Sequence, residues 1–186
     1  MANVHGLPER RRGNGAAQVD VERLRTLDDL ETLSPEQLAT LYAGGRPPQL
    51  GVLAGHARGR LLSVPALHAV PVVGALLDRL LIRAAALPLN PWRGKTFAAP
   101  AEHHRTSGDN DVLGRALLPF DAHVEKSALD HAPALIIRYA RPENPRLLRP
   151  VVDELREVAR GLWLGPSYVR GPNGPRILVW FAVAKG

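Results

Sequence analysis

Apolar residues near the start of the chain recur at the spacing of a helix. Residues 1–18 have few side chains large enough for a core, and we expect them to form a disordered basic tail. Within 19–45, Val21, Leu24, Leu27, Leu30 and Leu33 recur every three positions. Ser34-Pro35-Glu36-Gln37 then has the capping residues of a helix start, and Gly44-Gly45 ends that helix. The pattern predicts an N-terminal helical segment that plugs or flanks a sheet through Leu38, Leu41 and Tyr42.

The next part of the chain predicts one strand followed by one helix. Aliphatic residues flank the glycines between positions 52 and 64, which favours a first strand with a bend or bulge at Gly55 and Gly59. A helix over 70–86 is predicted by apolar residues at helical spacing with charged residues on the other side. The apolar positions of that helix are Val73, Leu76, Leu77, Leu80, Leu81 and Ala84.

After residue 90 the apolar pattern falls to a period of two. It predicts short strands over 92–98, 112–119, 122–127 and 134–139, with turns at 107–110 and 129–132. Residues 146–158 fit two structures. We favour a short helix, because one helical face would carry Leu148, Val151, Val152, Leu155 and Val158. The alternative is a strand, on which Glu154, Arg156 and Val158 alternate.

The C-terminal stretch predicts two strands around a tight connection. Gly171-Pro172-Asn173-Gly174-Pro175 is typical of a turn, because Asn-Gly supplies the positive φ angles of a hairpin loop. The return strand, 177–183, is apolar on both faces, which predicts a central strand covered on both sides. One face would carry Ile177, Val179, Phe181 and Val183, and the other Leu178, Trp180 and Ala182.

A chain that ends in its most buried strand indicates a closed or nearly closed antiparallel sheet. The order of elements is helices, a strand, a helix, and then about six short strands, as in small barrels that hold one ligand. We therefore expect a mainly β fold, with N-terminal helices and a helical insertion after the first strand. The expected division is a tail over 1–18, a helical segment over 19–45 and a barrel domain over 46–186.

Composition narrows the function classes. The 186 residues contain no cysteine, which excludes disulfides, thiolate nucleophiles and cysteine zinc sites. The formal net charge is +6, but the charges are interspersed and the only dense basic run is Arg10 to Arg12, so we expect no nucleic-acid partner. The longest apolar stretch, 70–89, is broken by prolines and charges, which predicts no transmembrane segment. Without a signal sequence in view, and with an Ala, Arg, Leu, Gly and Pro bias, we expect a bacterial cytoplasmic protein.

Several motifs together resemble a family. Trp92-Arg93-Gly94-Lys95-Thr96-Phe97 is followed by Asn110, Pro119-Phe120 and Ser127-Ala128-Leu129-Asp130, then by the two segments Asp153 to Val158 and Gly161 to Gly165. The set is similar to bacterial lipocalin-like (calycin) proteins, above all to uncharacterised ones with a GXWXG-type motif, although Asn90-Pro91 stands where the first glycine would be. The resemblance implies a β-barrel with an apolar cavity that binds or carries a small hydrophobic molecule. In such families the barrel is occasionally a cyclase or isomerase.

The candidate ligand-binding residues combine aromatic walls with one cation. Aromatic rings present broad apolar surfaces with a polar edge. Trp92, Arg93, Lys95 and Phe97 could close one end of the barrel, with Arg93 or Lys95 stacked on an indole or paired with a ligand carboxylate. Plain core packing of the rings, with the cations facing solvent, stays open as the alternative. The residues chosen on these grounds are Trp92, Arg93, Trp163, Tyr168 and Trp180.

Three residues are candidates for acid-base catalysis. Asp153 and Glu154 lie beside Arg156, and either carboxylate could act on a ligand if it were sequestered from water. The alternative is a structural pair in which Arg156 ties this segment to the barrel. His123 is a third candidate base. Consecutive residues of a strand point to opposite faces, so His103-His104 predicts no metal site.

The sequence thus leaves three functional hypotheses. The first is binding or carriage of a small hydrophobic molecule. The second is a cyclase- or isomerase-type enzyme that uses the same cavity, and the third is an interaction module built on the N-terminal helices and tail. No motif for nucleotides, cofactors or hydrolytic catalysis occurs, so no cofactor is expected. Homodimer formation stays open.

Overall fold

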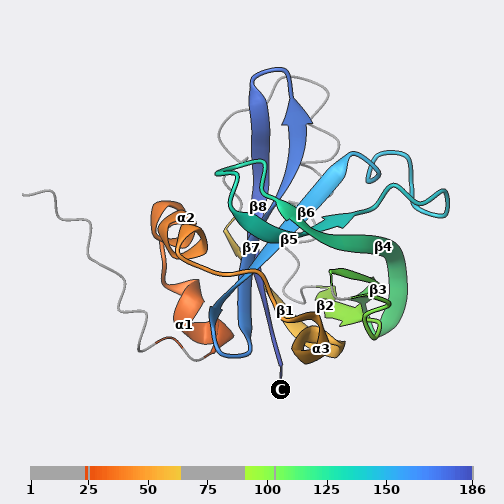
Figure 1. Ribbon diagram of the computed structural model, residues 1–186, viewed down its shortest axis with the longest axis horizontal. Helices are drawn as coiled ribbons and strands as arrows, with labels where there is room; N and C mark the ends of the chain where they lie inside the picture. The colour runs from red at the N-terminus through yellow and green to blue at the C-terminus, as the bar shows by residue number, and fades with distance from the viewer. Residues whose placement is uncertain (1–23, 25, 64–90, 103, 186) are drawn as a thin grey trace, which may run out of the picture.

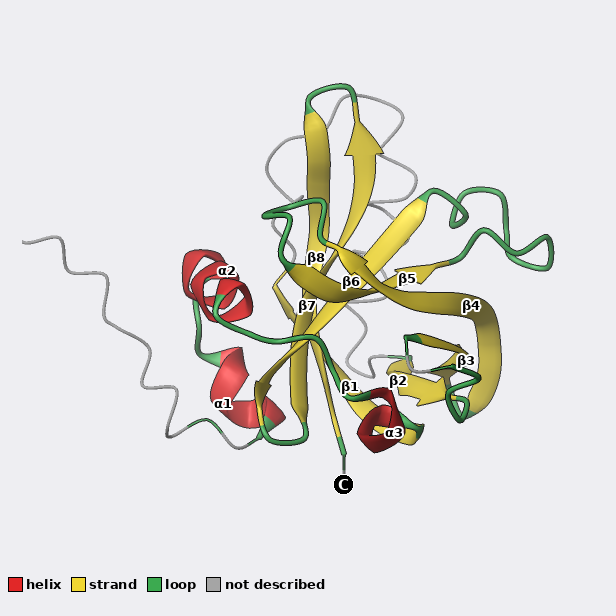
Figure 2. Cartoon of the chain, in the orientation of Figure 1, coloured by secondary structure: helices red, strands yellow, loops and turns green. Residues whose placement is uncertain are grey.

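Eight strands close into one antiparallel barrel (Figures 1 and 2). The structure is a computed structural model that describes residues 24, 26–63, 91–102 and 104–185. Each strand pairs with the next along the chain, and the last strand pairs with the first, so the predicted closed antiparallel sheet is confirmed. The strands are β1 (Gly55–Ser63), β2 (Trp92–Phe97), β3 (Arg105–Val112), β4 (Arg115–Lys126), β5 (Pro133–Arg138), β6 (Val151–Ala159), β7 (Leu162–Gly171) and β8 (Gly174–Ala184).

Within the described residues before the first strand there are three short helices, α1 (Leu27–Glu31), α2 (Pro35–Ala43) and α3 (Leu50–Leu53). Ser34 caps α2 through the main-chain N–H of Gln37, and Gln37 returns the bond, which confirms the predicted capping box. The expected tail over 1–18 and the expected helix over 70–86 lie outside the described residues. In the described part of the chain, no helix is long and apolar enough to cross a bilayer.

The first two helices cover the outside of the barrel. Leu38, Leu41 and Tyr42 are buried, as the helical pattern predicted. They belong to an outer apolar cluster with side chains of the last three strands, including Leu164 and Trp180. Figure 1 shows α1 and α2 together on one side of the barrel, beside the C-terminal strands. The helices therefore flank the sheet, and the barrel interior is left to the strands and α3.

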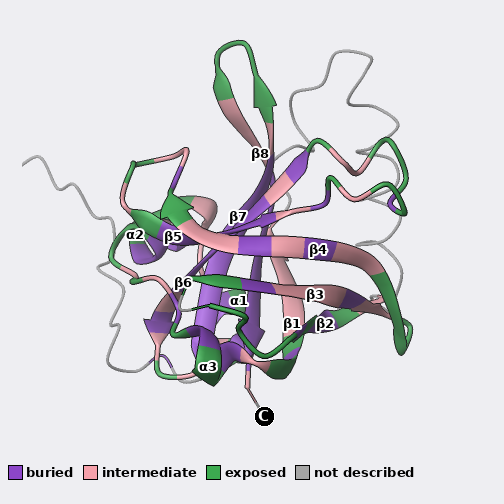
Figure 3. Cartoon of the chain, turned by 45° about the vertical axis from the view of Figure 1, so that its right-hand side comes forward, coloured by how far each residue is buried: buried purple, intermediate pink, exposed green. Residues whose placement is uncertain are grey.

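The last strand is buried on both faces, as predicted, and Figure 3 shows the burial running along β7 and β8. Phe181 and Val183 belong to the interior cluster, whereas Trp180 and Ala182 belong to the outer one. The register of the β7–β8 pair shifts between Ser167 and Tyr168. This shift changes the direction in which side chains near the start of β8 point. Because of it, Leu178 joins the interior cluster and Ile177 packs on the outer one, the reverse of strict alternation.

The first strand starts later than predicted. Residues 50–53 form α3 and not a strand, and the irregularity of β1 lies between Leu61 and Ser63, not at the glycines. Gly59 instead makes room for a neighbour, because a Cβ there would lie 2.4 Å from the indole ring of Trp92. A glycine placed for close approach gives the same sequence signal as a glycine placed for a bend.

The predicted turn at 107–110 is wrong, and so is the single strand over 112–119. Residues 107–110 lie inside β3, and the chain turns at Leu113 and Gly114, whose φ angles are 55° and 79°. Two central residues with positive φ are typical of a tight hairpin turn. Gly108 is needed within the strand, since a Cβ there would lie 2.0 Å from the main-chain oxygen of Thr96.

The favoured helix over 146–158 is also wrong, because residues 151–159 form β6. Leu155 lies in the interior cluster with Val151, whereas Val158 belongs to the outer cluster. Because both faces of β6 are covered, its apolar residues do not alternate with polar ones. Their spacing along the sequence therefore resembles that of a helix. The strand alternative was correct here.

Gly165 stands where the neighbouring strand leaves no room for a side chain. A Cβ at this position would lie 1.6 Å from the main-chain oxygen of Glu154, across the β6–β7 pair. Gly51 offers a matched control, because no atom lies within 4 Å of the place its Cβ would take.

We predict that Gly165→Ala lowers the free energy of unfolding by about 3 kcal/mol, because the strands must separate to admit the methyl group. Gly51→Ala should leave stability unchanged or raise it by about 0.5 kcal/mol, since alanine is the better helix former. Chemical denaturation of the two variants measures the difference. Equal stabilities would contradict the close approach of β6 and β7.

Candidate functional site

One end of the barrel interior contains a cavity of about 390 Å³. The opposite end is filled by side chains that include Phe97, Leu155 and Trp163, together with Leu50 and Leu53 of α3. The wall residues in strands come from β1, β2, β3, β4, β6, β7 and β8, and the others lie in the adjoining connections: Pro91, Tyr139, Pro145, Leu147 and Leu148. The lining consists of Leu61, Pro91, Trp92, Lys95, Asn110, Val112, Leu118, Tyr139, Pro145, Leu147, Leu148, Val151, Asp153, Ser167, Val179 and Phe181.

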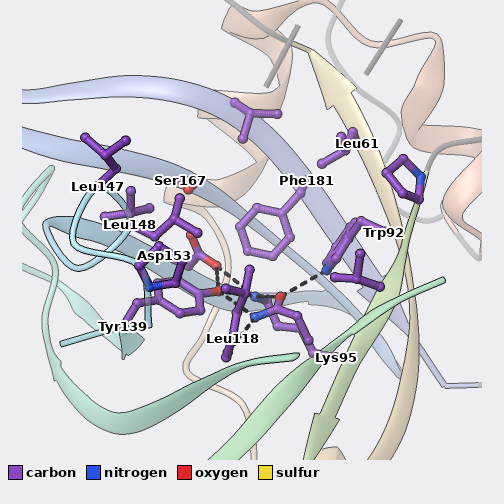
Figure 4. Close-up of a pocket in the computed structure, with 16 residues that line it drawn as sticks. Leu61, Trp92, Lys95, Leu118, Tyr139, Leu147, Leu148, Asp153, Ser167 and Phe181 are labelled. Carbon is purple, nitrogen blue, oxygen red and sulfur yellow. Dashed lines mark hydrogen bonds and ion pairs between the residues drawn. The ribbon is translucent and has the colours of Figure 1, made fainter. Parts of the chain in front are cut away.

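The walls of this cavity are mostly aliphatic and aromatic, but its base is a connected polar group (Figure 4). We call Trp92, Lys95, Asn110, Tyr139 and Asp153 the Lys95 cluster. Lys95, Asn110 and Asp153 are each at most 4% exposed, so these groups are removed from bulk water. Buried charges persist in proteins only when they are paired and hydrogen-bonded.

Hydrogen bonds connect the Lys95 cluster throughout. Lys95 Nζ lies 2.8 Å from Asp153 Oδ2 and donates to Asn110 Oδ1 at 2.8 Å and to the Tyr139 hydroxyl. Tyr139 donates in turn to Asp153 Oδ2 at 2.6 Å. Trp92 Nε1 donates to Asn110 Oδ1 at 3.0 Å, and the dashed lines of Figure 4 follow this chain of contacts. The carboxylate and the ammonium thus form a buried ion pair with a tyrosine bridging them.

An irregularity in β2 brings Trp92 and Lys95 to the same face. Strict alternation would place residues 92 and 95 on opposite faces of the strand. The register with β3 shifts between Trp92 and Gly94, so the intervening Arg93 is exposed and Lys95 turns inward. Gly94 permits this path, because its φ is 144° and a Cβ there would lie 2.1 Å from the main-chain oxygen of Ala57.

Asp153 reaches the cavity from a regular row of the sheet. Ile137, Asp153, Ser167 and Val179 are successive partners across β5, β6, β7 and β8. Directly paired residues of an antiparallel sheet project from the same face. Asp153 therefore lies inside the barrel between Ile137 and Ser167, and Figure 4 shows it beside Tyr139 at the base of the cavity.

Burial shifts the pKa of two members of the Lys95 cluster, Lys95 and Tyr139. The pKa of Lys95 is lowered because burial penalises its charged form, and the neighbouring Asp153 carboxylate opposes that shift. Burial, followed by the charge of Asp153, holds the pKa of Tyr139 well above its usual value. Four aromatic rings, those of Trp92, Phe120, Tyr139 and Phe181, lie with their centroids 5.2 to 5.6 Å from Lys95 Nζ and add cation–π attraction.

A second polar group lies on the outside of β6, and we call it the outer network. It consists of Tyr42, Asp130, Glu154, Arg156 and Tyr168. Glu154 Oε1 accepts hydrogen bonds from the Tyr168 hydroxyl at 2.9 Å and from the Ala128 main chain at 3.0 Å, while Oε2 accepts from the Tyr42 hydroxyl. Arg156 forms two 2.6 Å bonds to Asp130 and lies over the Tyr42 ring. This network ties α2 and the β4–β5 turn to the barrel wall.

Only two of the eight residues singled out from the sequence line the cavity, Trp92 and Asp153. Trp163 is inside the barrel but at its filled end. Tyr168 and Glu154 belong to the outer network, and Trp180 lies in the outer cluster with its ring against Tyr42.

The other two candidates point away from the interior. Arg93 is exposed beside the β3–β4 turn. His123 alternates with Ala122, which belongs to the interior cluster, and therefore lies on the outer face of β4. The structure thus separates residues that sequence spacing placed in one site.

Sequence reasoning did not select Asn110, Tyr139 or Ser167 for the site, and it considered Lys95 only as an alternative to Arg93 for contact with an indole or a ligand carboxylate. Lys95 carries a charge that is normally exposed, and only the irregularity at Arg93 turns it inward. Asn110 stood in a predicted turn and Tyr139 at the end of a predicted strand. Had β6 been assigned as a strand, alternation would have separated Asp153 from Glu154 and Arg156 and indicated that Asp153 alone faces inward.

The described residues contain no group of three or more His, Cys, Asp or Glu side chains that could hold a metal ion. No family model matches the chain, and no curated protein is significantly similar to it. Among solved structures, a protein from Thermomonospora curvata is similar, with 15% sequence identity and a TM-score of 0.45. The alignment covers 83% of this chain and 88% of that one. The molecule itself defines the class: a small antiparallel β-barrel with a cavity at one end and a buried ion pair at its base.

The protein has three tyrosines, and all three are buried. Burial raises the pKa of Tyr42, Tyr139 and Tyr168 above 10, with Glu154 or Asp153 adding to each shift. A pKa that is higher in the folded state gives stability that is present below the unfolded pKa of about 10 and is lost as pH rises above it.

We therefore predict that the folded protein shows almost no tyrosinate absorbance at about pH 11, where free tyrosine is mostly ionised. Stability should fall as the pH increases beyond about 10, and tyrosinate should appear together with the loss of β-sheet circular dichroism. A protein unfolded in denaturant provides the control titration. Tyrosinate absorbance that rises at ordinary pH while the barrel stays folded would contradict the burial of these hydroxyls.

Proposed function

We propose that this lipocalin-like barrel binds or carries one small, largely hydrophobic molecule in its open-ended cavity. The observation that carries the proposal is a mostly apolar cavity of about 390 Å³ with the polar Lys95 cluster at its base. Ligand sites in proteins typically have a volume of about 300–1,000 Å³, with mostly apolar walls and a few convergent polar groups.

Shape and chemistry support this proposal separately. Leu61, Leu118, Leu148, Val179 and Phe181 give the cavity walls that favour an apolar body. Among the described residues, the Lys95 cluster and the neighbouring Ser167 offer a polar end the groups with which it could form hydrogen bonds. A ligand with an apolar body and one polar end would therefore enter with its polar end toward Asp153.

A second candidate is an enzyme of the cyclase or isomerase type that uses the same cavity. It is favoured by one observation: Asp153 is a buried carboxylate at the cavity base, beside a lysine ammonium and a tyrosine hydroxyl that can supply protons to it. Glu154 and His123 are not in position for this role, because both face the outside of the barrel. Asp153 is the residue that would exchange a proton with the ligand.

We predict that the full-length protein binds the neutral fluorescent probe N-phenyl-1-naphthylamine in this cavity. Val179→Phe should weaken binding and Val179→Trp should weaken it further, by about tenfold or more, because the added rings occupy the space of the probe. Leu117→Trp is the control, since Leu117 is 45% exposed on the surface.

Fluorescence titration measures the affinities, and circular dichroism checks that each variant is folded. Binding by Val179→Trp that equals binding by the unchanged protein would place the probe elsewhere and refute the proposed site. To separate the two functions, a molecule that co-purifies with the protein is identified by native mass spectrometry and incubated with it. Recovery of the unchanged molecule supports a carrier, whereas conversion that is lost in Asp153→Asn supports an enzyme.

A further inference from the structure

The side-chain hydrogen-bond donors at the base of the cavity already have partners. Lys95 has three N–H donors and three acceptors around it, Asp153 Oδ2, Asn110 Oδ1 and the Tyr139 hydroxyl. The amide group of Asn110 donates to the main-chain oxygen of Leu118 at 3.1 Å and, more distantly, to Tyr139. Trp92 donates to Asn110 and Tyr139 donates to Asp153. A ligand thus finds no unused donor in the Lys95 cluster.

Two oxygen atoms at the base of the cavity, Asp153 Oδ1 and Ser167 Oγ, can still form hydrogen bonds with a ligand. Asp153 accepts both of its bonds on Oδ2, and among the described residues none donates to Oδ1. Ser167 lies directly opposite Asp153 in the β6–β7 pair and also lines the cavity. Its hydroxyl forms no hydrogen bond with the described residues, and Figure 4 shows Ser167 on the same side of the cavity as Asp153. Together they present a carboxylate acceptor beside a hydroxyl that can donate or accept.

We propose that the cavity selects hydrophobic alcohols over hydrophobic carboxylic acids. In this arrangement the ligand hydroxyl donates to Asp153 Oδ1 and accepts from Ser167 Oγ, while its apolar body contacts the aliphatic walls. The inference rests on the proposed binding function and specifies the chemistry of the ligand.

Charge supports the choice of a neutral hydroxyl. Lys95 and Asp153 neutralise each other at 2.8 Å, so the base of the cavity has no unpaired positive charge for a carboxylate. A ligand carboxylate would lose its hydration and would lie beside the Asp153 carboxylate, both of which oppose binding. An alkylammonium would likewise bring an uncompensated charge into an apolar cavity, whereas a hydroxyl loses little hydration and regains two hydrogen bonds.

Four probes with the same ten-carbon chain test the inference: 1-decanol, its methyl ether, decanoate and decylamine. Each displaces N-phenyl-1-naphthylamine from the full-length protein near neutral pH, and the displacement gives its affinity. We expect 1-decanol to bind most tightly. The ether should bind about tenfold more weakly, because it cannot donate to a charged acceptor, and decanoate more weakly still.

Ser167→Ala adds a matched variant that leaves the Lys95 cluster intact. It should weaken 1-decanol and its methyl ether each by about fivefold, since the oxygen of either probe accepts the neutral hydrogen bond that the variant removes. Decanoate, decylamine or the ether binding as tightly as 1-decanol would overturn the inference while leaving the binding function in place. Failure of the naphthylamine and of all four probes to bind would overturn the proposed function itself.

Discussion

The ion pair of Lys95 and Asp153 is the interaction on which the organisation of the barrel interior depends. Burying either charge alone is costly, and breaking such a pair by removing one partner costs about 3–5 kcal/mol. The pair therefore requires the irregularity of β2 that turns Lys95 inward and the pairing of Asp153 with Ile137 and Ser167 that holds the carboxylate on the inner face of β6. Tyr139 and Asn110 complete the remaining hydrogen bonds, and the cavity above this group stays lined with apolar side chains.

The two faces of β6 carry polar residues with different roles: the inner face contributes to the cavity, and the outer face holds the fold together. Asp153 faces the cavity, whereas Glu154 and Arg156 face α2 and the β4–β5 turn. Polar residues on the outer face fasten α2 to the wall, and α1 and α2 lie outside the barrel. This division explains how three charged residues of one strand, Asp153, Glu154 and Arg156, lie in two different environments.

Sequence patterns predicted the architecture better than the site. The closed antiparallel sheet followed from short strands and a final strand that is apolar on both faces, and the α2 boundary followed from Ser34 and Gln37. Local patterns gave the wrong structure where tertiary contacts determine it. Gly108 suggested a turn, but it lies in a strand and permits the close approach of its neighbour. Residues 151–158 have the apolar spacing of a helix because both faces of β6 are covered. The site was found only through Trp92 and Asp153, since an inward-facing Lys95 depends on a register irregularity that the sequence does not reveal.

A crystal structure of the full-length protein grown with N-phenyl-1-naphthylamine tests the central claim most directly. The account predicts electron density for the probe inside the barrel, between Trp92 and Val179, with Lys95 and Asp153 in contact beneath it. A Lys95 side chain that points to solvent, or an interior filled by side chains with the probe bound on the surface, would contradict it.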